Sequence, residues 1–92
     1  MSFPVVHVWQ QLMWHCDAHI VGNNEGLLKL KKAIDEAINS GKSEAKTFAS
    51  DGEGYDIKVI CIKDEETEYL AVSYTDEVAQ EKSEKAVYPW DM

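Results

Sequence analysis

Apolar residues recur at helical spacing between residues 24 and 41, and this is the clearest pattern in the chain. Spacings of three and four place side chains on one face of an α-helix. The expected apolar face consists of Leu27, Leu30, Ile34, Ala37 and Ile38, with Leu28 at its margin. Asn23 or Asn24 can cap the first turn, and Gly41 stands where a helix commonly ends. The pattern predicts one amphipathic helix of about four or five turns, which needs a surface to pack on.

Alternating apolar and polar residues predict strands on both sides of this helix. Residues 12–21 alternate strictly, and their apolar face is Trp14, Cys16, Ala18 and Ile20. Strands are also expected at 44–50 and, with the strongest pattern, at 55–63, whereas residues 1–11 allow at most a short edge strand because Pro4 limits pairing. The turn at 51–54 contains two glycines and closes a hairpin. A charged turn at 64–67 and a last strand at 68–74 complete a meander, and a weak helix follows at 75–85.

The expected fold class is α+β, with an antiparallel sheet of about four strands and the long helix packed on one face. The apolar faces of residues 14–20 and 55–61 would lie under the helix. The opposite sheet face would carry His15, Asp17, His19, Lys58, Ile60 and Ile62. Residues 1–11, residues 86–92 or a partner would then cover its isoleucines. With 92 residues, the chain is expected to form a single domain over 1–92.

The charge balance is acidic, with 17 Asp and Glu residues against nine basic ones and a formal net charge of −8. The excess lies in residues 43–92, and there is no arginine. Such a chain is a poor nucleic-acid binder, because basic side chains supply most of that affinity. An acidic surface favours a basic protein partner, although acids also keep a small protein soluble. No run is apolar enough for a membrane span and no secretory signal is recognisable, so a cytoplasmic protein is expected.

Candidate chemistry is sparse. His15, Asp17 and His19 share one strand face, but the two histidines would be about 13 Å apart, too far to bind one ion. Cys16 and Cys61 are expected to be reduced, buried thiols, and His15 would point to the opposite strand face from Cys16. No phosphate-binding glycine motif is present. The sequence therefore predicts neither an enzyme nor a bound cofactor or metal.

The run from Ile20 to Leu27, IVGNNEGL, continues at helical spacing through Leu30, Ala33 and Ile34 to Gly41. It resembles the GN-x-x-GL strand-turn-helix signature of the bacterial immunity protein 32 family, over roughly a quarter of the chain. The resemblance implies a small α+β protein that neutralises a bacterial toxin by binding it, without a catalytic group.

The expected binding surface is the acidic turn together with its aromatic neighbour. Its residues are Asp64, Glu65, Glu66, Glu68 and Tyr69. Nuclease toxins are commonly basic, so opposite charge would raise the association rate. The alternative function is that of a phage or prophage accessory protein that acts as a homodimer through the half-apolar sheet face containing Ile60 and Ile62.

Overall fold

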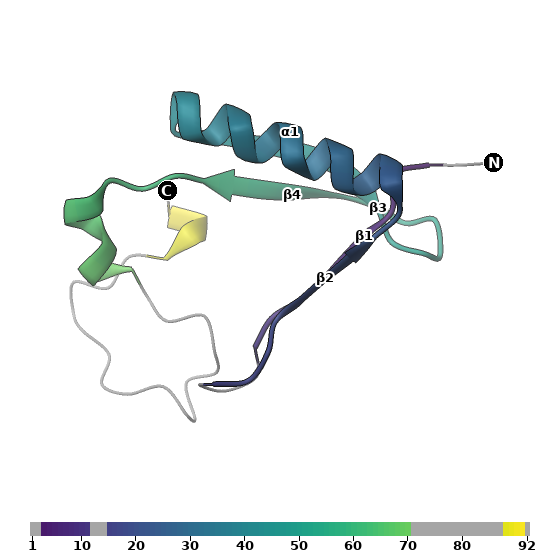
Figure 1. Cartoon of the computed structure of the whole chain (residues 1–92), viewed down its shortest axis with the longest axis horizontal. Helices are drawn as coiled ribbons and strands as arrows, with labels where there is room; N and C mark the ends of the chain where they lie inside the picture. The colour runs from purple at the N-terminus through teal and green to yellow at the C-terminus, as the bar shows by residue number, and fades with distance from the viewer. Residues whose placement is uncertain (1–2, 12–14, 71–87, 92) are drawn as a thin grey trace. The chain divides into compact units, whose positions relative to one another are not determined.

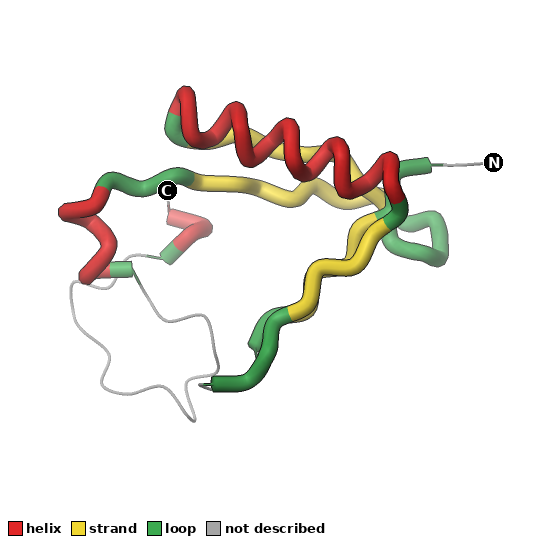
Figure 2. Tube along the Cα trace, in the orientation of Figure 1, coloured by secondary structure: helices red, strands yellow, loops and turns green. Residues whose placement is uncertain are grey.

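The structure is a computed structural model that describes residues 3–11, 15–70 and 88–91, without the side chains of Glu68, Tyr69 and Asp91 (Figure 1). The elements in chain order are β1 (Val6–Trp9), β2 (His19–Gly22), α1 (Asn24–Ser40), β3 (Lys42–Phe48), β4 (Gly54–Ile60), η1 (Asp64–Tyr69) and η2 (Pro89–Asp91). Both η elements are 3₁₀ helices. Strand β1 pairs with β2 and β3 pairs with β4, in two separate two-stranded sheets (Figure 2). The α+β class is confirmed, but the prediction of one four-stranded sheet under the helix is wrong.

The chain divides into two compact units. One unit contains Met1–Val8 and Ile20–Cys61, and therefore holds α1, β3 and β4. The other contains Trp9–His19 and Ile62–Met92, and its described helices are η1 and η2. The expectation of a single domain over residues 1–92 stays a prediction.

Helix α1 begins and ends as its sequence predicts. Asn23 is the N-cap, and its side-chain oxygen accepts a hydrogen bond of 2.8 Å from the Gly26 N–H. Glu25 places a negative charge in the first turn, where the helix dipole favours it. Gly41 ends the helix with a positive φ of 103°, and its N–H donates to the Ala37 carbonyl over 2.7 Å.

The buried stripe of α1 differs from the predicted one. Its buried residues are Gly26, Leu30, Ala33 and Ala37, three of which have small side chains or none. The helix packs mainly on β3, where the facing Ala45 is also small and buried. The Ser43 hydroxyl also donates to the Ala33 carbonyl. Small residues allow a close approach of the two backbones, and they leave the larger Leu27, Ile34 and Ile38 exposed beside the contact.

Strands β3 and β4 form an antiparallel hairpin whose register joins Lys42 to Ile60 and Phe48 to Gly54. The turn between them is closed by hydrogen bonds from Ala49 N–H to the Glu53 carbonyl and from Gly52 N–H to the Ala49 carbonyl. The hairpin face toward α1 contains Ser43, Ala45, Thr47, Tyr55, Ile57 and Val59. The other face pairs opposite charges across the strands, Glu44 with Lys58 and Lys46 with Asp56, and so suits contact with water.

The N-terminal segment is held by both the helix cap and the hairpin. The Asn23 side chain accepts from the Val5 N–H over 3.0 Å and donates to the Phe3 carbonyl over 2.7 Å. The Pro4 carbonyl accepts from the Phe48 N–H over 2.8 Å, and the Phe3 and Phe48 rings meet edge to face. Val6 is fully buried, and its carbonyl accepts from the Tyr55 hydroxyl. These bonds join three parts of the first unit that are far apart in sequence.

Two predicted strands differ from the structure. The strand expected at 12–21 is reduced to β2, because residues 15–18 are not extended and His15 has a φ of 64°. Its expected apolar side chains Cys16, Ala18 and Ile20 are exposed rather than placed under the helix, and residues 12–14 lie outside the described residues. The strand expected at 68–74 is also wrong at its start, because residues 68 and 69 belong to η1.

Other expectations fall on residues that the structure does not describe. They are the remainder of that strand at 71–74, the weak helix at 75–85 and the first residues of the tail at 86–87. In the described part of the tail, Tyr88 stacks on Trp90 with ring centroids 5.1 Å apart, and the Trp90 side chain is exposed.

We expect Asn23→Ala to lower the free energy of unfolding by about 2–3 kcal/mol. Loss of the cap costs about 1 kcal/mol, and each of the two bonds to the N-terminal segment contributes about 1 kcal/mol more. Urea denaturation followed by circular dichroism measures the change. Asn39→Ala is the matched control, because Asn39 is exposed on the same helix and its loss should cost less than about 0.5 kcal/mol. Equal effects of the two substitutions would contradict the linking role of Asn23.

Candidate protein-binding surfaces

The predicted acidic turn is a short 3₁₀ helix with exposed carboxylates. Asp64, Glu65 and Glu66 occupy its first turn, and all three side chains are exposed. The helix is closed by backbone hydrogen bonds from Glu66 N–H to the Lys63 carbonyl, 2.9 Å, and from Leu70 N–H to the Thr67 carbonyl, 3.2 Å. Of the five predicted contact residues, Asp64, Glu65 and Glu66 therefore lie together. The side chains of Glu68 and Tyr69 lie outside the description.

Glu66 stabilises the start of this turn through a hydrogen bond to the backbone. Its carboxylate accepts a hydrogen bond of 3.2 Å from the Lys63 N–H, which is otherwise an unsatisfied donor at the start of the helix. The carboxylates of Asp64 and Glu65 remain exposed beside it. The turn thus presents two exposed negative charges on a backbone that a third carboxylate helps to hold.

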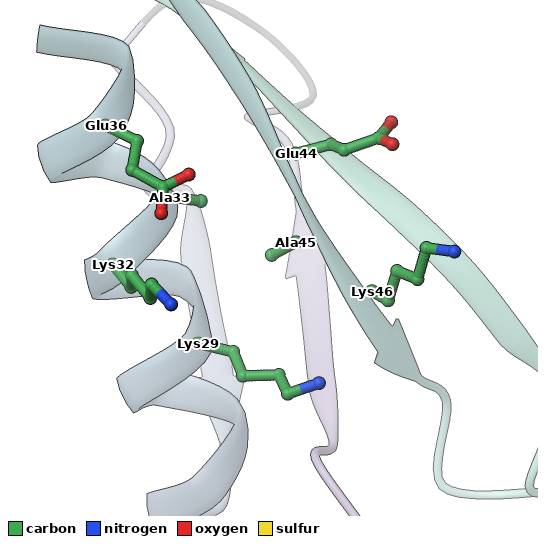
Figure 3. Close-up of a pocket in the computed structure, with 7 residues that line it drawn as sticks. All are labelled: Lys29, Lys32, Ala33, Glu36, Glu44, Ala45 and Lys46. Atoms are coloured by element: carbon green, nitrogen blue, oxygen red, sulfur yellow. The ribbon is translucent and has the colours of Figure 1, made fainter. Parts of the chain in front are cut away.

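A second candidate surface, which sequence reasoning missed, is an open hollow of about 320 Å³ between α1 and β3 (Figure 3). Lys29 and Lys32 reach from the helix toward the strand, with Glu36 beside them. Ala33 and Ala45 form its floor, while Glu44 and Lys46 point to the far side of β3. The hollow arises because two alanines face each other where larger side chains would fill the space. It combines charges of both signs and suits water or a mixed-charge segment better than a small anion.

The two flanks of α1 differ in chemistry. Lys29, Lys32 and Glu36 make up the flank that borders the outer edge of β3. The other flank, which we call the apolar flank, consists of Leu27, Ile34 and Ile38, and all three are exposed. The helical period places these two sets on opposite sides of the buried stripe. Hydrophobic periodicity did predict these apolar residues, but it assigned them to the core.

The candidate metal and nucleophile positions do not form a site. His15 lies in a turn and residues 16–18 are irregular, so His15, Asp17 and His19 do not share a regular strand face. Within residues 3–11, 15–70 and 88–91, no three side chains of His, Cys, Asp or Glu are grouped so that they could hold a metal ion. Both cysteine thiols, Cys16 and Cys61, are reduced and exposed, so the prediction that they are buried is wrong.

The sheet face that was expected to support a dimer is mainly charged. Ile60 is half-buried there, opposite Lys42, and the next cross-strand pairs are Lys58 with Glu44 and Asp56 with Lys46. A face of this composition is stable in water without a partner. Self-association through Ile60 therefore has little apolar area to drive it.

The GN-x-x-GL segment has a structural explanation. A Cβ atom at Gly22 or Gly26 would collide with the Val5 carbonyl, so both glycines allow the N-terminal segment to lie against the helix start. Between them, Asn23 caps the helix and binds Val5 and Phe3. The motif therefore builds the junction of β1, β2 and α1.

Comparison with known proteins adds no assignment. No family model, curated protein or solved structure matches the chain. Among the helices that the described residues form, none has the length and apolar character needed to cross a bilayer. The surfaces above therefore carry the functional argument.

We expect Glu66→Ala to loosen the start of η1. Removal of its bond to Lys63 should cost about 1 kcal/mol locally, which corresponds to roughly fivefold faster exchange of the Lys63 amide hydrogen. Hydrogen exchange followed by NMR measures this rate. Glu65→Ala serves as the control, because this substitution removes an equal charge at an exposed position and leaves the bond between Glu66 and Lys63 in place. Equal acceleration in both variants would assign the effect to charge rather than to capping.

Proposed function

We propose that this chain is a protein-binding module that neutralises a basic toxin domain by direct binding, as an immunity protein does. The observation that carries the proposal is the acidic turn η1, where three consecutive residues, Asp64, Glu65 and Glu66, have exposed side chains. The whole chain has a net charge of −8. The resemblance of residues 20–41 to the immunity signature supports it independently.

The proposed mechanism is occlusion assisted by electrostatic steering. A negative surface raises the rate at which a basic partner arrives, and the effect falls as salt screens the charges. Asp64 and Glu65 provide this field from a turn with defined backbone hydrogen bonds. A bound inhibitor then blocks the toxin surface by its volume, which requires a stable scaffold and no reacting group.

The scaffold and the recognition surface are separate in this proposal. The GN-x-x-GL junction stabilises the first unit, while the acidic turn belongs to the second.

The direct experiment is growth protection. First, the gene upstream of this one is sequenced. If it encodes a large secreted protein with a basic C-terminal domain, that domain is expressed in a host cell, once alone and once together with this chain. Growth only in the presence of the chain, with a purified complex of the two proteins, is the expected result. Absence of such a neighbouring protein, or of binding to it, would contradict the proposal.

The double substitution Asp64→Lys with Glu65→Lys should slow association with that basic domain roughly tenfold at low salt and flatten its salt dependence. Stopped-flow fluorescence at several salt concentrations measures both quantities. The control Asp35→Lys with Glu53→Lys changes the net charge equally at exposed positions outside η1. If both double variants slow association to the same degree, overall charge and not the acidic turn steers the encounter.

A further inference from the structure

The apolar flank of α1 lies beside a partly uncovered sheet face. Because the charged flank borders the outer edge of β3, Leu27, Ile34 and Ile38 lie on the β4 side of the helix. The helix packs less on β4 than on β3, and the inward-facing Ile57 and Val59 are only half-buried. The β4 side of the first unit therefore presents five apolar side chains that are at least partly exposed.

The same side of the hairpin carries the outer edge of β4, with which no described residue pairs. Cys61 N–H donates to the Gly41 carbonyl over 2.8 Å, and the register continues this pattern, so odd-numbered β4 residues direct their backbone groups toward β3. Asp56, Lys58 and Ile60 consequently direct theirs outward. Within the described part of the chain, no residue hydrogen-bonds to these outward groups. An open strand edge next to apolar surface is a template for pairing with another strand.

We propose that two copies of this chain associate through their β4 strands, edge to edge and antiparallel, with the apolar flanks of the two α1 helices packed over the join. The two-fold axis passes beside Ile57, so that each Asp56 lies opposite Lys58 of the other copy. On the inner face, Tyr55 lies opposite Val59 of the other copy, and the two Ile57 residues meet at the axis. The result is one four-stranded sheet with two helices on the same face.

This register satisfies both the backbone and the charges. Asp56 and Lys58 are outward-directed residues, so their pairing forms the closely spaced hydrogen bonds of an antiparallel ladder. A two-fold axis repeats every contact, and one complementary charge pair therefore occurs twice. A shift of the axis to Lys58 would instead place the two lysines opposite each other, which is unfavourable.

The outer edge of β3 is a poorer candidate for the same role. The Phe48 N–H at one end already donates to Pro4, and the Lys42 carbonyl at the other end accepts from the Ser40 hydroxyl over 3.2 Å. The helix flank above this edge is charged and therefore costly to bury. Of the two hairpin edges, the β4 edge is therefore the one that combines apolar side chains with backbone groups that no described residue binds.

The first test is the mass of the purified full chain by sedimentation equilibrium over a range of micromolar concentrations. A concentration-dependent dimer is expected, and Ile38→Asp should weaken it at least about tenfold. Leu28→Asp is the matched control, since Leu28 is 55% exposed and Ile38 is 65% exposed on the same helix, but only Ile38 lies on the apolar flank. Circular dichroism verifies that each variant is folded.

The register has its own test. Asp56→Lys alone and Lys58→Asp alone should each be monomeric, because like charges then face each other across the axis. An equal mixture of the two variants should form a heterodimer, because every Lys then lies opposite an Asp. The neighbouring pairs on β3 are exposed and contribute little to folding, so both variants should remain folded.

Three results would overturn the proposal. They are a wild-type chain that is monomeric throughout the concentration range, equal weakening by Ile38→Asp and Leu28→Asp, and a mixture of the charge variants that stays monomeric. These measurements use the chain alone, so their failure leaves toxin neutralisation unaffected.

Discussion

The first unit depends on the contact between Asn23 and the N-terminal segment. One amide side chain caps α1, accepts from Val5 and donates to Phe3, while the neighbouring Pro4 carbonyl binds the hairpin at Phe48. The Asn23 side chain is exposed, and its loss would leave the Gly26 and Val5 N–H groups and the Phe3 carbonyl without this partner. The helix, the hairpin and β1 thus share one small polar junction, and the glycines on either side of Asn23 leave the space that it needs.

The close contact of α1 with β3 explains where the apolar surface lies. Small residues face each other across this contact, so the helix approaches the strand and its larger apolar residues fall to one side. The fully buried core within residues 3–11, 15–70 and 88–91 is correspondingly small. A protein built in this way has apolar area left for association, and it can keep a charged turn for a different partner.

Local signals in the sequence predicted local structure well. The cap at Asn23, the end at Gly41 and the hairpin turn at 51–54 each rest on residue types with a specific backbone requirement, and all three are present. Periodicity identified Leu30 and Ala37 of the buried stripe, but it missed Gly26 and Ala33, because it weighs size and hydrophobicity whereas the contact selected small residues. The strand predicted from the alternation over 12–21 is wrong because the backbone turns at His15. The residue types near His15 did not predict this turn. The acidic turn was found from charge alone, but the bond between Glu66 and Lys63 was not predictable without coordinates.

The contacts of the N-terminal segment with the hairpin also set an order for folding. Helix α1 and the β3–β4 hairpin are contiguous from residue 24 to residue 60, so their contacts close short loops. The hydrogen bonds from the Ser50 N–H to His7 Nε2 and from the Tyr55 hydroxyl to the Val6 carbonyl span 43 and 49 residues. Closing longer loops costs more chain entropy, and non-local contacts slow folding. During synthesis these two bonds can form only after residues 50 and 55 have left the ribosome, so β1 docks on the hairpin late even though it is made first.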